Sequence, residues 1–181
     1  MTPVLPPVLC IIGRKDSGKT GLTVAVAAEL NRRGHKVMTA KHGHGFQVDH
    51  PGKDSWRHRH EGGALRTVMS GPRDFAVVGG WPNEELPLSE LVRRFLWDAD
   101  MVLAEGFKNA PEPKIEIFRK GFHSAPLYDP SGPDADRTVA LVTDDPSIEV
   151  AIPVFSLGDP DLFGALADFV EEIAGLKAGS G

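Results

Sequence analysis

Eight consecutive residues near the N-terminus have the types and spacing that bind nucleotide phosphates. They are Gly13, Arg14, Lys15, Asp16, Ser17, Gly18, Lys19 and Thr20, and they fit G-x-x-x-x-G-K-[ST] at every position. The two glycines let successive backbone N–H groups face a phosphate, Lys19 reaches the β and γ phosphates, and Thr20 places a hydroxyl on Mg2+. With Gly21 directly after them, these residues predict a site for a nucleoside triphosphate and Mg2+, with Lys19 as a candidate catalytic residue.

A magnesium site also needs a carboxylate, and the run from Asp100 to Gly106 offers one at each end of an apolar strand. Ligands of open α/β sheets bind at the carboxyl ends of the strands. This rule favours Glu105 over Asp100, which then is a charge at the start of a strand. Gly106, next to Glu105, would let the backbone approach a phosphate closely.

Elements around the phosphate loop must hold these residues in place. Val8–Ile12 is an apolar, β-branched run that predicts a buried parallel strand ending at Gly13. Apolar positions between Lys19 and Arg33 recur at helical spacing, and Gly34 follows as a C-cap. A strand at Lys36–Ala40 completes a βαβ unit, for which a right-handed crossover is the default.

The rest of the chain continues to alternate strands and helices. A polar segment, 41–64, contains a short helix from Ser55 with Asp54 as N-cap. Further expected elements are a hairpin of Leu65–Met69 and Phe75–Val78, a helix in 84–97, strands at Met101–Ala104, Ile115–Phe118, Val139–Val142 and Val154–Leu157, and a C-terminal helix with Asp159 at its N-cap and Pro160 first. The pattern predicts an α/β fold of the P-loop NTPase type: a doubly wound, mostly parallel sheet flanked by helices. We expect a single nucleotide-binding domain over 1–177 and a frayed tail at 178–181.

Composition excludes several classes of protein. The 181 residues are 41% hydrophobic and 25% charged, as in folded globular proteins, and no apolar run approaches the roughly 20 residues that span a bilayer. The prolines at positions 3, 6 and 7 do not fit a signal peptide. Cys10 is the single cysteine and cannot form an internal disulfide, which fits a reducing cytoplasm.

Charge is distributed unevenly along the chain. The net charge of −5 argues against nucleic-acid binding, yet residues 1–73 carry 12 Lys and Arg against 5 Asp and Glu. The remaining residues are strongly acidic. A local positive field in an acidic protein suits a small phosphorylated ligand.

Four segments together resemble one family. They are the GRKDSGKT loop, AKHGHGFQVDHPGKDSWRHRHEGGA (40–64), AEGFK (104–108) and PKIEIFR (113–119), and they resemble molybdopterin-guanine dinucleotide biosynthesis protein B, the MobB family. The resemblance covers about residues 8–157. It implies a dimeric, weakly hydrolytic P-loop GTP-binding protein that assists the partner enzyme MobA in attaching GMP to molybdopterin.

The resemblance also implies roles for single residues. Thr20 and Glu105 would serve Mg2+, and Asp49 would occupy a switch-like loop as a further metal and catalytic candidate. Related dimeric P-loop proteins often have a lysine at the second loop position, which reaches the partner subunit. Arg14 stands there instead, and it could contact phosphate in cis or in trans. Without a certain water-positioning glutamine, we expect slow hydrolysis.

Recognition of guanine has no clear motif, because NKxD is absent. Thr143 and Asp144 follow a predicted strand where a base contact would lie, and Asp144 could accept hydrogen bonds from guanine N1–H and N2–H2. The same residues equally fit a simple turn.

Five of the seven histidines lie within the 41–64 segment: His42, His44, His50, His58 and His60. Their spacing gives little support to a zinc site, since no cysteine is near and His58 and His60 face different ways on a helix. With Lys41, Lys53, Arg57 and Arg59 they could instead hold a pterin phosphate or an acidic partner surface, and Trp56 could stack on a flat ring.

Three functions remain open. The first is a GTP-binding accessory protein of molybdenum-cofactor guanylation. The second is an ATP-dependent small-molecule kinase or ligase with residues 41–64 as acceptor site. The third is a regulatory switch that signals through the same segment.

Overall fold

The computed structural model describes residues 4–43, 45 and 48–176, and it divides the chain into two compact units. The first comprises residues 1–42 and 88–181, and the second residues 43–87. The predicted nucleotide-binding domain is thus interrupted by a separate unit between its second strand and the helix of 88–95. His44 and the predicted tail at 178–181 lie outside the described residues. No helix in the described part of the chain is long and apolar enough to cross a membrane.

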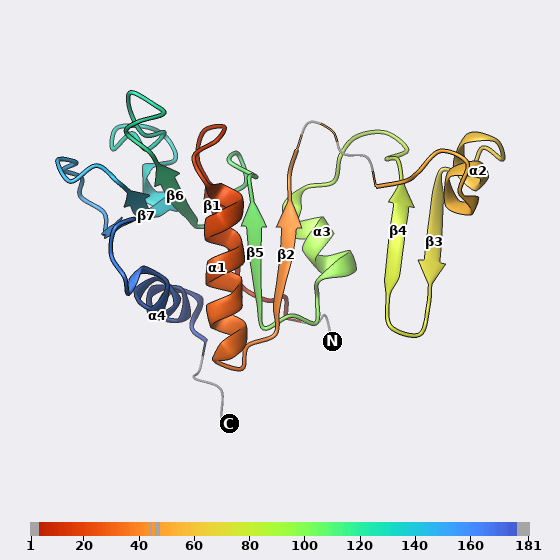
Figure 1. The fold of residues 1–181 in the computed structure, drawn as a ribbon, viewed down its shortest axis with the longest axis horizontal. Helices are drawn as coiled ribbons and strands as arrows, with labels where there is room; N and C mark the ends of the chain where they lie inside the picture. The colour runs from red at the N-terminus through yellow and green to blue at the C-terminus, as the bar shows by residue number, and fades with distance from the viewer. Residues whose placement is uncertain (1–3, 44, 46–47, 177–181) are drawn as a thin grey trace. The chain divides into compact units, whose positions relative to one another are not determined.

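A six-stranded sheet in the order β2-β5-β1-β6-β7-β8 forms the first unit, and all of its strand pairs are parallel. Its strands are β1 (Val8–Ile12), β2 (Val37–Lys41), β5 (Met101–Glu105), β6 (Lys114–Phe118), β7 (Thr138–Thr143) and β8 (Val154–Ser156). Figure 1 shows β2, β5 and β6 pointing to the edge at which the loop after β1 enters the first helix. This arrangement confirms the predicted α/β fold and gathers the carboxyl ends of the strands at one edge.

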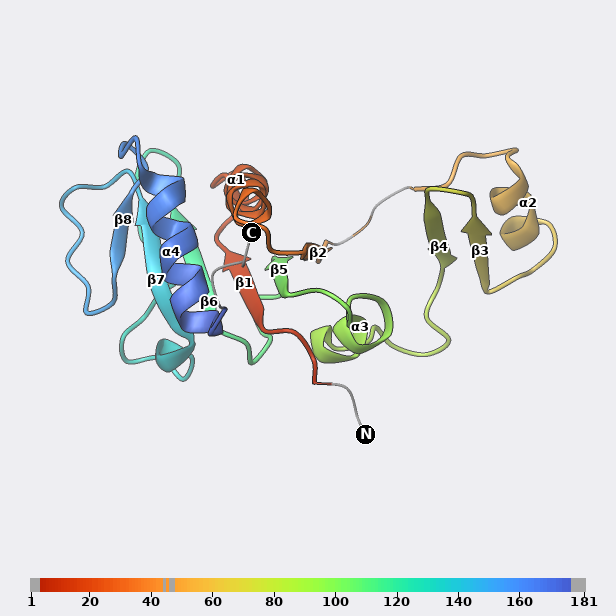
Figure 2. The same cartoon turned by 90° about the horizontal axis from the view of Figure 1, so that it is seen from below.

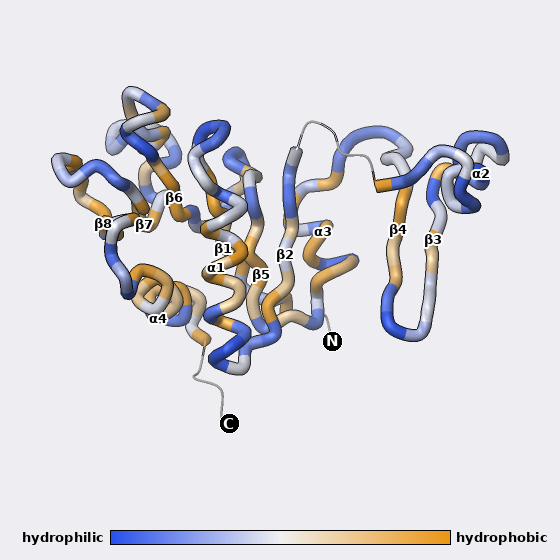
Figure 3. The backbone as a smooth tube through the Cα atoms, in the orientation of Figure 1, coloured by the Kyte–Doolittle hydropathy of each residue, from blue (hydrophilic) through white to orange (hydrophobic). Residues whose placement is uncertain are grey.

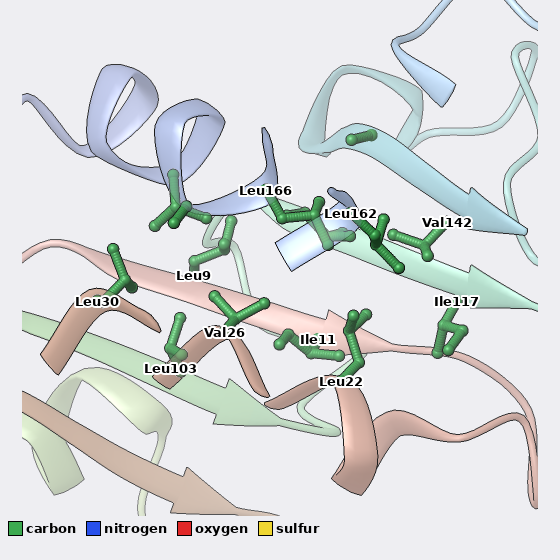
Figure 4. Close-up of a cluster of buried hydrophobic side chains, with 14 of the residues drawn as sticks. Leu9, Ile11, Leu22, Val26, Leu30, Leu103, Ile117, Val142, Leu162 and Leu166 are labelled. Atoms are coloured by element: carbon green, nitrogen blue, oxygen red, sulfur yellow. The ribbon is translucent and has the colours of Figure 1, made fainter. Parts of the chain in front are cut away.

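Helices cover both faces of the sheet, as in a doubly wound fold. α1 (Lys19–Arg32) and α4 (Leu162–Ala174) pack on one face, where their leucines and valines meet those of β1 and its neighbours. Figure 4 shows Leu22, Val26 and Leu166 of these helices against Leu9 and Ile11. α3 (Leu88–Phe95) buries two residues against the opposite face, and Figure 2 shows α1 and α3 on opposite sides of β1. The loop after β1 is therefore fixed by a strand and a helix that are both anchored in the core.

The connection from β6 to β7 is anchored by a buried carboxylate. Glu116 of β6 is 1% exposed, and its two oxygens accept hydrogen bonds from the backbone N–H groups of Leu127 (2.5 Å) and Tyr128 (2.8 Å). Burial raises the pKa of Glu116, while these two N–H donors oppose that shift. The connection also contains a short 3-10 helix, η1 (Ala135–Arg137).

The second unit consists of α2 (Asp54–His60) and an antiparallel hairpin of β3 (Arg66–Ser70) and β4 (Phe75–Gly79). The hairpin confirms the prediction from the turn residues between the two strands. Three of its apolar residues lie on one face and are exposed: Val68 (67%), Phe75 (71%) and Val77 (40%). A two-stranded sheet with an uncovered apolar face has little stability of its own.

Several helix ends differ from the prediction. α2 begins at Asp54 with Lys53 as N-cap, so Asp54 is inside the helix and not its cap. α4 begins at Leu162 with Asp161 as N-cap, because Asp159 Oδ1 accepts the N–H of Asp161 in a turn before the helix. α1 ends with Arg33 as C-cap, and Gly34 follows with a φ of 93°, the left-handed geometry that glycine favours.

Candidate nucleotide-binding site

The phosphate loop lies between β1 and α1, at the carboxyl edge of the sheet. Gly18 precedes α1 with a φ of 99°, and no side chain caps this helix end by a hydrogen bond. The positive end of the helix dipole is therefore directed at the loop without a competing side-chain acceptor. Figure 3 shows the contrast in hydropathy between this polar loop and the apolar strands that hold it.

Gly13 allows the loop to close tightly over β6. A Cβ atom at Gly13 would lie 2.5 Å from the Ile117 carbonyl oxygen and 2.6 Å from Ser17 Oγ, and its φ is 152°. Ser17 Oγ is buried in the space that the missing side chain leaves, and it has no hydrogen-bond partner among the described residues. The first glycine of the motif is thus required by packing as well as by backbone geometry.

Lys19 turns back over the loop. Its Nζ donates a hydrogen bond to the Arg14 carbonyl oxygen at 2.7 Å, so the ammonium lies along the arc of backbone that a phosphate would occupy. A phosphate oxygen would offer this donor a charged acceptor in place of a neutral one, and charge-assisted hydrogen bonds are stronger.

Thr20 and Glu105 meet across the carboxyl edge of the sheet, as expected. Thr20 Oγ1 lies 2.9 and 3.0 Å from the two carboxylate oxygens of Glu105, and Glu105 is only 8% exposed. Asp100 lies at the amino end of the same strand, where its Oδ2 accepts the Lys36 backbone N–H. Of the two carboxylates, the structure thus brings Glu105 to the phosphate loop.

These two residues fit a magnesium ion that takes its remaining ligands from phosphate and water. The described residues contain no group of three or more His, Cys, Asp or Glu side chains that could hold a metal without further ligands. Mg2+ usually binds through one or two protein oxygens plus substrate phosphates. A hydroxyl and a buried carboxylate beside a phosphate loop are that kind of donor set.

Gly106, directly after β5, lies close to the backbone that follows β2. It adopts a φ of 90°, its N–H donates to Ile11, and a Cβ atom there would lie 3.2 Å from the His42 carbonyl oxygen. The glycine thus lets the end of β2 pass close to the end of β5. Its predicted contact with a phosphate stays a prediction.

The predicted base-contact residues are engaged in a turn. Asp144 accepts hydrogen bonds from Arg119 Nε and from the Lys120 backbone N–H, both at 2.8 Å. The hydrogen bond from Arg119 lowers the pKa of Asp144. Thr143 Oγ1 is buried and accepts the Asp145 N–H. A guanine bound by Asp144 would share the carboxylate with these two donors.

The connection from β6 to β7 also touches the phosphate loop itself, which the sequence did not indicate. His123 Nε2 lies 2.8 Å from the Lys15 carbonyl oxygen, and Arg14 Nε donates to the Ala125 carbonyl oxygen at 3.4 Å. Arg14 therefore contacts the first unit's own backbone in this structure. No local pattern could have linked residues more than a hundred positions apart.

Asp49 belongs to the second unit. It is buried, accepts a hydrogen bond from Ser55 Oγ at 2.8 Å, and lies 3.5 Å from Arg59. These contacts fix the entry into α2. Its predicted catalytic and metal roles stay predictions.

The histidines of the second unit do not gather with acidic residues into a metal cluster within the described residues. His60 instead stacks on Trp56, with ring centroids 4.5 Å apart and an angle of 23° between the planes. Trp56 thus already has a flat ring against it.

Comparison with known proteins identifies the family. The family profile described as "Molybdopterin guanine dinucleotide synthesis protein B" matches residues 8–144. The chain belongs to the MobB family. Two proteins named molybdopterin-guanine dinucleotide biosynthesis adapter protein are similar to this chain along nearly its whole length. The protein of Haemophilus influenzae is 34% identical over 91% of this chain and 88% of its own length, and that of Escherichia coli is 32% identical over 92% of both.

Solved MobB structures share the fold. The crystal structure of Bacillus subtilis MobB superposes with a TM-score of 0.68 at 24% identity, covering 90% of this chain and 96% of that one. A structure described as molybdopterin-guanine biosynthesis protein B superposes with a TM-score of 0.66 at 25% identity, covering 92% and 99%. The predicted resemblance to MobB is therefore confirmed by sequence and by fold.

Proposed function

We propose that this MobB protein binds Mg-GTP at residues 13–21 and acts as an adapter for a guanylyltransferase of the MobA type in molybdenum-cofactor biosynthesis. The observation that carries the proposal is the contact of Thr20 with Glu105 beside a complete phosphate loop. The names of the two curated relatives support the adapter role. The reducing cytoplasm, where GTP is available, suits its unpaired and buried Cys10.

The chemistry of the loop supports an accessory role over catalysis of the transfer. Joining GMP to a pterin phosphate requires attack on the α-phosphate with pyrophosphate leaving. A loop of this type holds the β and γ phosphates and suits attack at γ. Hydrolysis at γ should be slow, about 10⁻⁴ to 10⁻² per second as in unassisted P-loop GTPases.

Calorimetry tests the nucleotide preference directly. GTP, ATP and GDP are titrated with and without Mg2+, and the proposal expects tighter binding of GTP than of ATP and a gain with Mg2+. Equal or tighter ATP binding would favour the kinase or ligase alternative.

Reconstitution tests the adapter role. Purified molybdopterin, Mg2+ and limiting GTP are combined with a transferase, with this protein, or with both. We expect dinucleotide only with the transferase, and at a higher rate when this protein is added. Dinucleotide formed by this protein alone, or a transferase rate that does not change, would contradict the adapter role.

We also propose that the protein is a homodimer. The exposed apolar face of the hairpin, formed by Val68, Phe75 and Val77, supports this, since apolar sheet faces are normally covered. Light scattering at micromolar concentration should give twice the chain mass of 19.5 kDa. A monomeric mass would contradict the proposal.

The strand-end geometry gives a prediction for the metal. Glu105→Gln removes one anionic ligand and leaves the phosphate loop intact, so the gain in GTP affinity on adding Mg2+ should shrink more than GTP affinity without Mg2+. Asp100→Asn is the matched control, because Asp100 lies at the other end of β5 and contacts Lys36. If only Asp100→Asn loses the gain in GTP affinity on adding Mg2+, then Asp100 and not Glu105 is the magnesium ligand.

A further inference from the structure

Lys41 brings a third charged group to Thr20 and Glu105. It is the last residue of β2, and the parallel register places it directly beside Glu105, the last residue of β5. Its Nζ lies 3.0 Å from Glu105 Oε1 and 3.4 Å from Thr20 Oγ1. The ammonium thus contacts both oxygen donors that would bind a magnesium ion.

Two cations of the phosphate loop, Lys19 and Arg14, are engaged elsewhere. Lys19 Nζ donates to the Arg14 carbonyl oxygen, and Arg14 Nε donates to Ala125. Lys41 is therefore the cation that neutralises Glu105 in the described part of the chain. Its side chain is 63% exposed, so its flexible stem is free to move without disturbing the core.

An ammonium and Mg2+ compete for these oxygens. Magnesium requires oxygens at about 2.0–2.1 Å in near-octahedral geometry, and a second cation in contact with the same oxygens would be repelled. Mg2+ at these oxygens would therefore displace the Lys41 ammonium from Glu105. Mg2+ would bind together with the anionic triphosphate. The Lys41 side chain is flexible and carries a compact charge beside the phosphate loop, so its ammonium could then contact a phosphate oxygen.

We propose that Lys41 is a tethered cation that holds Glu105 and Thr20 in the metal-free protein and moves to the terminal phosphate of a bound nucleoside triphosphate when Mg2+ takes its place. The inference rests on the proposed function, because it assumes a triphosphate in the loop. It adds Lys41 to the site as a residue that competes with Mg2+ in the nucleotide-free protein and binds phosphate in the nucleotide complex.

The two roles predict changes of opposite sign in Lys41→Met, a variant of similar length without the charge. The affinity of the nucleotide-free protein for Mg2+ alone, measured from the rise in melting temperature with Mg2+, should increase about two- to fivefold. Calorimetry should show the same two- to fivefold rise in affinity for Mg-GDP, because its metal meets the same competition from Lys41. The ratio of Mg-GTP to Mg-GDP affinity should fall about two- to fivefold, because only the triphosphate loses a contact between its terminal phosphate and Lys41.

Lys36→Met is the matched control, because Lys36 precedes the other end of β2 and pairs with Asp98. It should change none of the three affinities. A Lys41→Met protein that binds Mg2+ no better than the wild type would overturn the competition. An unchanged ratio of Mg-GTP to Mg-GDP affinity would overturn the transfer to phosphate. A wild type that binds no triphosphate would contradict the proposed function instead, while the titration with Mg2+ alone would still test the competition.

Discussion

Lys19→Ala should lower the affinity for Mg-GTP about ten- to a hundredfold, because a charge-assisted contact to a phosphate is worth roughly 1.5–3 kcal/mol. In the structure the Lys19 ammonium donates to a carbonyl oxygen of the loop, and a triphosphate would replace this neutral acceptor with a charged one. The loss should appear for GTP, ATP and GDP alike, since the lysine contacts phosphates and not the base. Calorimetry on the purified variant measures it.

The fold should tolerate this change. Lys19 occupies the first turn of α1, and alanine has the highest helix propensity. Its melting temperature without nucleotide should match that of the wild type. Lys36→Ala removes an exposed lysine at the amino end of β2, opposite the edge that holds the loop, and should leave GTP binding intact. A folded Lys19→Ala protein that binds GTP as tightly as the wild type would contradict nucleotide binding at this loop.

Gly13→Ala should damage both stability and binding. The added Cβ would lie 2.5 Å from the Ile117 carbonyl oxygen, a backbone atom that cannot rotate away, at a φ of 152° that is nearly restricted to glycine. Strain and overpacking each cost about 1–3 kcal/mol, which corresponds to a fall in melting temperature of at least about 4 °C for a chain of this size. Differential scanning calorimetry measures the fall.

Gly21→Ala separates this effect from a general loss of glycine. Gly21 lies within α1, and a Cβ atom there would meet nothing within 4 Å. Alanine at that position should leave stability unchanged or raise it by up to about 1 kcal/mol. If Gly13→Ala melts with the wild type and binds GTP equally well, the tight closure of the loop over β6 is not required.

Local signals were sufficient to predict the phosphate loop and its two flanking elements. The apolar run of β1, the glycines and the helical spacing of α1 all lie within 25 consecutive residues, so each signal supports the next. The hairpin of β3 and β4 was predicted for the same reason. Glu105 was placed by a general rule about strand ends, which the parallel sheet confirms.

Features that depend on strand order were not predicted. The contact of Lys41 with Glu105 requires β2 to lie next to β5, and residues 64 positions apart give no local sign of this. Buried charges were missed likewise. Lys114 is 1% exposed and donates to the carbonyl oxygens of Ala110 and Glu112, and burial lowers its pKa. A charge can be buried in a strand when the backbone of a nearby loop supplies its hydrogen-bond partners. Irregular loop backbone has no periodic sequence pattern, so the sequence gives no sign of these partners.

The strand order also determines when the site can form as the chain is synthesised. β1 pairs only with β5 and β6, and β2 pairs with β5, so neither strand has a partner until residues 101–118 exist. At about 5–20 residues per second, this leaves the phosphate loop's strand unpaired for about 5 to 20 s. Residues 101–118, which supply the missing partner strands, also contain Glu105. A nascent chain therefore acquires the partner strand of its phosphate loop and the carboxylate facing Thr20 in one step.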